Sequence, residues 1–238
     1  MTLIRSIIFQ CLFMVINVVL CIGLIWILVL PKRWAYNVLY YCYFSLVDVM
    51  ERWILGLDYK VTGIENLPKS GSYIVAMKHQ SAYETLKLYL IFGDIRAIVK
   101  KELLWLPLWG WYAARMGMIG VDRGKGKSAV ESMLKNSKSV IDQGIPIVIY
   151  PQGTRVSVET SSAEKPYKYG AARLYNHYDI PIVPVALNSG KFWPRKSFLI
   201  KSGTVEFKIL PPLKPGLDMD EAHRQMSIAI ENESKKLL

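Results

Sequence analysis

The amino-terminal part of the chain contains an apolar stretch with the length of a membrane segment. Residues 6–30 include no charged side chain and are bounded by Arg5 and by Lys32-Arg33. A bilayer core requires roughly 20 apolar residues of helix. A signal peptide has a shorter apolar region, about 7 to 15 residues, followed by small residues at a cleavage site. This stretch ends in bulky residues and a proline, so the pattern predicts a retained membrane-anchoring helix over 6–30.

A second apolar stretch, 34–57, is rich in Tyr, Leu, Trp and Val but also contains Asp48, Glu51 and Arg52. Charged side chains make a complete membrane span costly. The pattern therefore indicates an interfacial helix, or the return arm of a helical hairpin that lies partly in one leaflet. We expect residues 1–58 to form an amino-terminal membrane anchor and residues 59–238 to form a second domain.

After Tyr59 the pattern changes to short β-rich runs separated by longer segments of mixed polarity. We expect strands within 73–77, 97–99, 118–121, 145–150, 182–187 and 204–210. We expect helices near 82–92, 127–143, 169–178 and 218–236. Alternation of this kind predicts an α/β domain with a mixed, largely buried sheet that is flanked by helices.

Composition and charge narrow the classes of partner. The chain has 238 residues and 52% hydrophobic positions, and its 30 Lys and Arg against 19 Asp and Glu give a net charge of +11. Residues 1–58 hold four basic and three acidic side chains, so the basic character belongs to the second domain. Such a domain favours anionic partners and the cytoplasmic side of a membrane. The chain shows no nucleic-acid-binding motif, so we expect no nucleic-acid partner.

The cysteines and histidines argue against a disulfide framework and a metal centre. Cys11, Cys21 and Cys42 all lie in the first fifth of the chain and form no C-x-x-C pair. The chain contains three histidines. Three cysteines and three histidines are few ligands for a structural zinc site, and we expect no metal.

The most informative cluster, residues 78–84, follows the first expected buried strand. A histidine at the carboxyl end of a strand lies where α/β sheets collect their ligands. If the next helix begins at Ser81, then His79 lies on the approaching loop, Glu84 lies in the first turn, and the two side chains can meet. The carboxylate would then hold one imidazole nitrogen and leave the other as a general base. Ser81-x-x-Glu84 is also a capping box, a purely structural alternative.

Basic residues follow three other expected strands. Arg123 comes after 118–121, Arg155 after 145–150, and Lys100 and Lys101 after 97–99. The planar fork of arginine suits a phosphate, although each of these residues alone is compatible with a surface ion pair. Because several strands are each followed by a basic residue, the set of these residues indicates an anion-binding site.

Two other catalytic motifs do not fit. A P-loop that ends at Gly126-Lys127-Ser128 would need glycine at 121, where the chain has Val121, and no G-x-S-x-G motif occurs. A nucleoside triphosphate site and a serine hydrolase of the α/β type are therefore disfavoured. The aromatic run 104–112 suits a protein core as well as it suits an interfacial surface or an acyl groove.

As a set, these residues make the chain similar to the bacterial 1-acyl-sn-glycerol-3-phosphate acyltransferases of the glycerolipid acyltransferase family. The resemblance covers about residues 59–215 and rests on four ordered blocks. His79 and Glu84 fall on the family's H-x4-D motif, and residues 117–123 resemble a second block that ends in arginine. Residues 150–155 resemble its F-P-E-G-T-R block, and residues 180–184 resemble its apolar, proline-containing fourth block.

The resemblance implies an enzyme that transfers an acyl group from acyl-CoA or acyl carrier protein to the sn-2 hydroxyl of lysophosphatidic acid, and so makes phosphatidic acid for phospholipid biosynthesis. His79 would be the general base and Glu84 its orienting carboxylate. The residues implied to bind the phosphate and glycerol of the acceptor are Lys100, Lys101, Arg123, Gln152, Gly153, Thr154 and Arg155. No cofactor is implied. The expected location is the bacterial inner membrane, with the catalytic domain on the cytoplasmic face.

Two positions depart from the family pattern. Glu84 replaces an aspartate and is one methylene longer, which still allows contact with an imidazole nitrogen if the backbone turn adjusts. Gln152 replaces a glutamate, so any ionic role of that position is lost while hydrogen bonding remains. These differences leave two alternatives open: an acyltransferase of the same fold that uses another lyso-lipid, and a non-catalytic lipid-binding relative.

Overall fold

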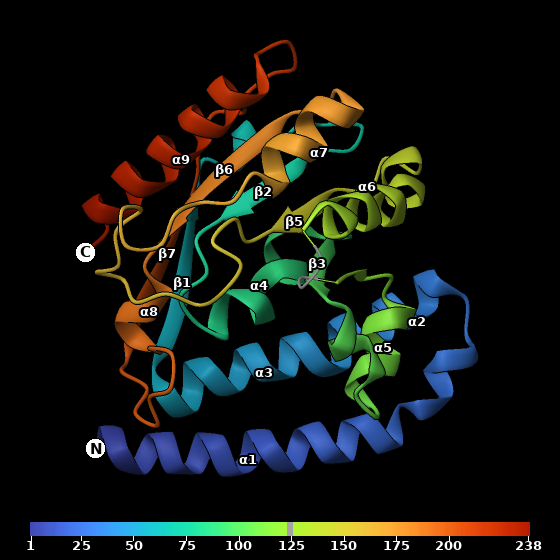
Figure 1. Cartoon of the computed structure of the whole chain (residues 1–238). Helices are drawn as coiled ribbons and strands as arrows, with labels where there is room; N and C mark the ends of the chain where they lie inside the picture. Colours follow the sequence, from blue (N-terminus) through green and yellow to red (C-terminus); the bar gives the residue numbers. More distant parts are fainter. Residues whose placement is uncertain (123–125) are drawn as a thin grey trace.

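A mixed β-sheet runs through the middle of the molecule (Figure 1). The computed structural model describes residues 1–122 and 126–238. Within these residues the sheet has seven strands in the order β1-β7-β6-β2-β5-β3-β4. The β6 and β7 strands pair antiparallel, and all other neighbours pair parallel. The strands are β1 (Leu57–Thr62), β2 (Ile74–Met77), β3 (Arg96–Lys100), β4 (Ile119–Val121), β5 (Ile147–Ile149), β6 (Ile182–Leu187) and β7 (Gly203–Ile209).

Helices cover both faces of the sheet because its central strands are apolar on both sides. Along β2, Val75 and Met77 belong to one hydrophobic core, and Ile74 and Ala76 belong to the other. The first core also takes in the amino-terminal helices, α4 and α5, and the second takes in α6, α7 and α9. These helices are α4 (Tyr83–Phe92), α5 (Trp109–Arg115), α6 (Lys127–Asp142), α7 (Gly170–Tyr178) and α9 (Met219–Lys236). Among the described residues the domain also contains the short elements η4 (Ile64–Asn66), η5 (Lys101–Trp105) and α8 (Ser189–Phe192).

The amino-terminal region forms a helical hairpin. Its first arm comprises α1 (Thr2–Gly23) and the 3-10 helix η1 (Ile25–Val29), which together replace the single helix expected over 6–30. Its second arm is a nearly continuous helix, and Gly56 ends it in the left-handed conformation, with φ +64°. The parts of the second arm are α2 (Lys32–Leu39), η2 (Tyr40–Phe44), α3 (Ser45–Met50) and η3 (Glu51–Leu55). In Figure 1, α1 lies along the base of the molecule, with α3 between it and the sheet.

The acidic side chains of the second arm, Asp48 and Glu51, face α4. The Lys87 ammonium of α4 lies 2.5 Å from Asp48 Oδ1 and also forms an ion pair with the fully buried Glu51. It lies 4.7 Å from the centroid of the Tyr83 ring, a cation–π contact. Asp48 and Glu51, two of the charges that make a membrane span costly, are therefore paired with Lys87, whereas the Arg52 side chain is 44% exposed.

The structure confirms the predicted mixed α/β fold and contains a strand within or overlapping each expected run. The strand that sequence reasoning missed is β1, which crosses the expected boundary between residues 58 and 59. Its apolar residues Leu57, Tyr59 and Val61 alternate with polar ones, because β1 lies at the edge of the sheet and one side is solvated. Within the described residues, α1 is the one helix long and apolar enough to cross a membrane, and it is a candidate membrane anchor.

Candidate active site

His79 lies two residues beyond the last residue of β2, on the short loop that leads into α4. Its Nδ1 atom lies 2.7 Å from Oε1 of Glu84, which occupies the first turn of α4. The Glu84 carboxylate is fully buried, and the His79 side chain is 16% exposed. The two residues that the sequence paired are therefore in direct contact, and the longer glutamate reaches the imidazole.

The Glu84 carboxylate also closes the start of α4. Its Oε1 atom accepts hydrogen bonds from the backbone N–H groups of Gln80 and Ser81, each at 2.8 Å. Ser81 Oγ in turn accepts a hydrogen bond from Tyr83 N at 3.1 Å. Helix capping and contact with His79 are therefore two roles of one side chain, rather than competing interpretations.

The hydrogen bonds that Glu84 accepts determine which ring nitrogen of His79 carries the proton. Because backbone N–H groups can only donate, Oε1 is an acceptor, and the ring nitrogen that faces it must carry its proton. In a neutral imidazole the lone pair then lies on Nε2. Among the described residues, no hydrogen bond engages Nε2. The imidazole of His79 can therefore accept a proton at Nε2.

Tyr150, at the carboxyl end of β5, supports the ring from the side. The His79 and Tyr150 rings stack with centroids 4.1 Å apart and an interplanar angle of 24°. Burial, reinforced by the nearby Glu84 carboxylate, raises the pKa of Tyr150 well above its usual range. The phenol therefore stays neutral at physiological pH and acts as an apolar platform for the imidazole.

A polar cavity of about 580 Å³ opens beside this loop. Gln80 and Gly190 form part of its wall, and Thr154 and Arg155 line it from the segment after β5. The backbone N–H of Val156 donates to His79 O at 2.7 Å, which fixes that segment against the histidine loop. The basic side chains along the cavity are Arg155, Lys165, Arg195 and Lys196, with Glu164 as the acidic one. This balance suits an anionic ligand.

Gln152 and Gly153 shape the turn that carries Thr154 and Arg155. Gln152 is buried, and its Nε2 donates to Lys165 O at 3.0 Å. Gly153 has a φ of +71°, a conformation that favours glycine, and a Cβ there would approach Lys168 Nζ to 3.2 Å. Both residues therefore help to fix the backbone conformation of this turn. Their contact with a ligand stays a prediction.

The remaining predicted cations lie elsewhere or outside the described residues. Lys100 is exposed at the end of β3, and β5 separates β3 from β2, a lateral offset of roughly 10 Å. Lys101 lines a different cavity, of about 370 Å³, beside β4 at the edge of the sheet. The residue Arg123 falls outside the described ranges. Of the predicted strand-end cations that the structure describes, it thus places Arg155 nearest to the His79 loop.

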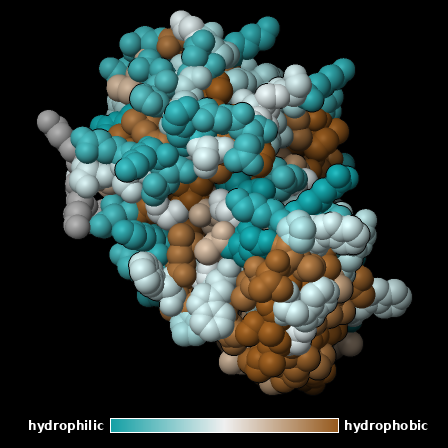
Figure 2. Space-filling model, turned by 90° about the vertical axis from the view of Figure 1, so that its right-hand side faces the viewer, coloured by the Kyte–Doolittle hydropathy of each residue, from teal (hydrophilic) through white to brown (hydrophobic). Residues whose placement is uncertain are grey.

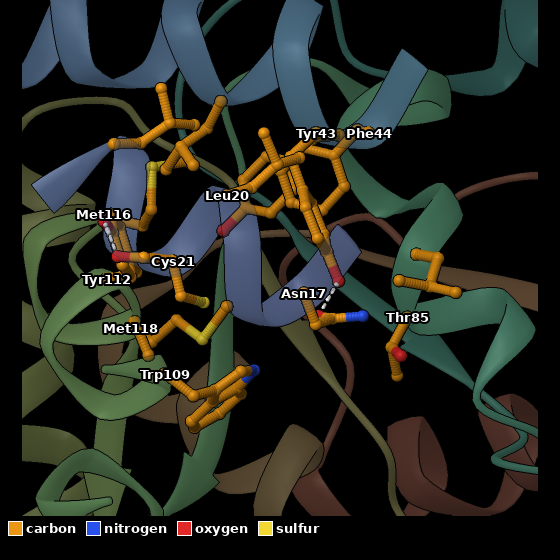
Figure 3. Close-up of a pocket in the computed structure, with 15 residues that line it drawn as sticks. Asn17, Leu20, Cys21, Tyr43, Phe44, Thr85, Trp109, Tyr112, Met116 and Met118 are labelled. Carbon is orange, nitrogen blue, oxygen red and sulfur yellow. Dashed lines mark hydrogen bonds between the residues drawn. The ribbon is translucent and has the colours of Figure 1, made fainter. Parts of the chain in front are cut away.

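An apolar pocket lies between the helical hairpin and the helices α4 and α5 (Figure 3). Its wall includes Leu20 and Cys21 of α1, Tyr43 and Phe44 of η2, and Met118 before β4. Two hydrogen bonds hold the walls together: Tyr43 Oη donates to Asn17 Oδ1, and Tyr112 Oη donates to Cys21 O, both at 2.8 Å. From α4 the pocket is lined by Thr85 and Leu86, which directly follow Glu84 in the sequence. Trp109 also lines the pocket and Trp105 is largely exposed, whereas Tyr112 is buried, so the aromatic run 104–112 has members in the core and at the surface.

Sequence reasoning missed two residues that complete the site. Ser189 begins α8, and its hydroxyl donates to Glu84 Oε2 at 2.6 Å. Arg195 lies beyond α8, and its guanidinium donates to Arg155 O at 2.9 Å and to Thr154 Oγ1 at 3.3 Å. Neither residue belongs to a local motif in the sequence. Their partners lie far away along the chain, so only the folded structure reveals them.

Comparisons with known proteins identify the family and the fold. A family model described as Acyltransferase matches residues 58–188. The chain is 30% identical to a 1-acyl-sn-glycerol-3-phosphate acyltransferase of Pseudomonas aeruginosa, over 79% of this chain and 70% of that protein. It is 33% identical to a protein of the same name from Saccharomyces cerevisiae, over 72% of this chain and 55% of that protein. Its fold matches the crystal structure of a 1-acyl-sn-glycerophosphate acyltransferase from Thermotoga maritima, with TM-score 0.77, 19% identity, and coverage of 100% of this chain and 98% of that chain.

Proposed function

The chain belongs to the acyltransferase family, and we propose that it transfers a fatty acyl group from an acyl thioester to the sn-2 hydroxyl of lysophosphatidic acid. The observation that carries the proposal is the His79–Glu84 pair, with Nδ1 held at 2.7 Å and Nε2 free of hydrogen bonds within the described residues. The names of the relatives supply the acceptor, a lyso-lipid with a phosphomonoester. The product is phosphatidic acid, a precursor in phospholipid biosynthesis.

The proposed chemistry is direct transfer with His79 as general base. Nε2 removes the proton of the sn-2 hydroxyl while the oxygen attacks the thioester carbonyl carbon. The C–S bond then breaks, and the proton on Nε2 passes to the departing thiolate. Glu84 stabilises the transient imidazolium and holds its orientation. The transfer needs no protein nucleophile, and holding the two substrates in the reacting geometry contributes to the rate.

The acceptor phosphate is proposed to bind at the cavity lined by Thr154 and Arg155. A guanidinium offers paired donors that match phosphate oxygens, and the Thr154 hydroxyl adds a further polar contact. Gln152 and Gly153 hold this turn in place. Lys100, Lys101 and Arg123 remain proposed contributors to the phosphate site, although Lys101 lines a different cavity beside β4.

The apolar pocket between the helical hairpin and α4 is proposed to hold part of an acyl chain. Its lining is predominantly apolar, and it begins next to the turn that carries Glu84. Its volume is about 140 Å³. An apolar cavity of that size accepts a small apolar group, so it accommodates a segment of a chain rather than all of it.

The geometry of α1 supports attachment parallel to the membrane surface rather than a perpendicular span. The helix contacts the domain from Ser6, which bonds to Ile200, to Cys21, whose carbonyl accepts from Tyr112. A perpendicular span would carry those partners into the bilayer. The opposite flank of α1 is apolar and exposed, and Figure 2 shows hydrophobic side chains gathered over the base of the molecule. This arrangement fits a helix that enters one leaflet.

Two further parts of the proposal concern the donor and the location. The donor is an acyl thioester of CoA or of acyl carrier protein, and the basic domain suits either carrier. The proposed location is the bacterial inner membrane with the domain on its cytoplasmic side, because Lys32 and Arg33 follow the apolar segment. No cofactor is required for the proposed transfer.

A panel of acceptors tests the proposed function. The purified full chain in detergent micelles would receive a labelled long-chain acyl thioester and, in turn, lysophosphatidic acid, lysophosphatidylcholine, lyso-ornithine lipid and monoacylglycerol. We expect the highest kcat/KM with lysophosphatidic acid. A preference for an acceptor without a phosphomonoester would replace the proposed acceptor and keep the reaction class. Lipid binding without transfer to any acceptor would favour the non-catalytic alternative.

A further inference from the structure

The segment from Trp193 to Ser202, between α8 and β7, forms an ordered loop at the end of the sheet next to α1. Its base is closed by a hydrogen bond from Lys201 N to Phe192 O, at 2.8 Å. Its turn is fixed by Ser197, whose hydroxyl donates to Leu199 O and accepts from Leu199 N at 3.0 and 3.1 Å. Compact loops with tied ends are frequently functional. We refer to residues 193–202 as the α8–β7 loop.

This loop is attached to the first turns of α1. Ile200 N donates to Ser6 Oγ at 2.9 Å, and both residues are buried. Gln10 Nε2 donates to Phe198 O at 2.6 Å. The rings of Phe9 and Trp193 meet edge to face, with centroids 5.6 Å apart. In Figure 1 the orange segment after α8 extends down to the amino-terminal end of α1. The loop and the helix therefore form one rigid surface.

The tip of the loop carries apolar side chains that the protein leaves uncovered. Phe198 is 50% exposed and Leu199 is 45% exposed, although both sit in a well-fixed turn. The first turns of α1, which the loop contacts, also expose apolar side chains: Leu3, Ile4 and Ile7. Single exposed hydrophobic residues are normal, but a continuous patch marks an interaction surface.

Basic side chains border the same tip. Lys196 and Lys201 are exposed on either side of Phe198 and Leu199, and Lys196 has a φ of +63°, an uncommon conformation for a residue with a side chain. An apolar tip with cations beside it matches the boundary between acyl chains and anionic headgroups. Charge and hydrophobicity together therefore select a lipid surface over a protein partner.

We propose that the α8–β7 loop is a second membrane-contacting element, which inserts Phe198 and Leu199 beside α1 and places Lys196 and Lys201 at anionic headgroups. The inference rests on the proposed membrane attachment of α1. It has a consequence for substrate access, because Arg195 of the same loop holds Thr154 and the carbonyl of Arg155. One rigid loop thus joins the lipid surface to the proposed phosphate site, on the path of an acceptor that leaves the leaflet.

Site-specific fluorescence on the full chain tests the contact directly. In a background with Cys11→Ser, Cys21→Ser and Cys42→Ser, the polarity-sensitive dye NBD is attached at Leu199→Cys. Matched probes are attached at Met14→Cys on the exposed flank of α1 and at Lys69→Cys, at the opposite end of β2 from His79. On vesicles of phosphatidylglycerol and phosphatidylcholine, we expect a several-fold rise in emission at 199 and 14, quenched by lipids that carry doxyl groups, and no change at 69.

Water-like emission at position 199 overturns the proposal. The probe at 14 then shows whether membrane binding as a whole has failed or only the loop contact. A second arm compares Lys196→Glu/Lys201→Glu with the control Lys69→Glu/Lys135→Glu, which makes the same charge change on exposed sites away from the loop. We expect the first variant to lose roughly tenfold or more in partitioning to the anionic vesicles and the second to lose little. Equal losses would contradict the proposed role of the two lysines. Acyl transfer by the wild type in detergent micelles is measured in parallel, because failure of that reaction would count against the proposed function and not against the loop. The wild type is used because Lys196 also lines the polar cavity and Cys21 also lines the apolar pocket.

Discussion

The hydroxyl of Ser189 lies 2.6 Å from Oε2 of Glu84, although 105 residues separate them along the chain. Both side chains are fully buried. Gly190 N also donates to Gln80 Oε1, at 3.0 Å. Two hydrogen bonds thus join the start of α8 to Glu84 of α4 and to Gln80, the residue that follows His79. The Glu84 carboxylate, which orients His79, is therefore itself positioned by a residue that follows β6.

Removing the Ser189 hydroxyl should weaken catalysis without weakening acceptor binding. In Ser189→Ala, Oε2 of Glu84 loses a donor, so we expect kcat to fall roughly threefold to thirtyfold while the KM for the acceptor stays near the wild-type value. Ser189→Thr keeps a hydroxyl and should restore most of the rate. Ser137→Ala, a buried serine on α6, is the matched control. A rise in KM alone, or no rescue by threonine, would argue against a positioning role.

The charge of Glu84 should matter more than its shape. Glu84→Gln keeps the length and an acceptor oxygen but cannot stabilise an imidazolium, so we expect kcat to fall by roughly 10² to 10⁴. Glu84→Asp keeps the charge and shortens the side chain by one methylene, and should retain more activity than the glutamine variant. Steady-state kinetics with folding checked by circular dichroism would decide the order. Equal activities of the two variants would show that charge at this position is unimportant.

Arg155 should act on acceptor affinity. Loss of a charge-assisted contact to phosphate costs about 1.5 to 3 kcal/mol, so Arg155→Ala should raise the KM for lysophosphatidic acid roughly tenfold to hundredfold. The KM for the thioester should change little. Arg173→Ala on α7 removes an exposed arginine and serves as the control. If the donor KM rises instead, the cavity beside Thr154 binds the donor.

The buried ion pair between Glu51 of the helical hairpin and Lys87 of α4 predicts that stability depends on pH. Burial raises the pKa of Glu51 to about 7 from its ordinary 4.5, against the opposing effect of Lys87. Between these values the folded state holds more protons than the unfolded state, so stability falls as the pH rises from about 4.5 to about 7. Thermal melts across this range should show a Tm that decreases more steeply for the wild type than for Glu51→Gln. The exposed control Glu65→Gln should follow the wild type, and parallel slopes for all three would contradict the assignment.

The sequence predicted the parts of the site that depend on local spacing. His79 and Glu84 lie five residues apart across one strand-to-helix turn, so the end of β2 and the start of α4 suffice to bring them together. The strand pattern likewise predicted the mixed α/β fold. The edge strand β1 was missed because its alternating polar residues follow directly on a helix, and one residue, Gly56, separates the two elements.

The parts that depend on strand order were not accessible from the sequence. Lys101 and Arg155 both follow a strand, yet β3 lies two positions from β2 while β5 is its neighbour. The contact of Ser189 with Glu84 and that of Arg195 with the Arg155 carbonyl join distant segments. Such contacts follow from how β6 and its loop pack beside β2, which hydrophobic periodicity does not specify.

The proposed transfer depends on removal of the acceptor hydroxyl proton by Nε2 of His79. The most direct measurement is acyl transfer from a labelled long-chain thioester to lysophosphatidic acid by the wild type, by His79→Ala and by His177→Ala, a control at an exposed histidine of α7. We expect His79→Ala to lose at least roughly 10² to 10⁴ in kcat while it binds lipid and melts as the wild type does. The control should keep full activity. Transfer by His79→Ala at a rate near that of the wild type would contradict the account.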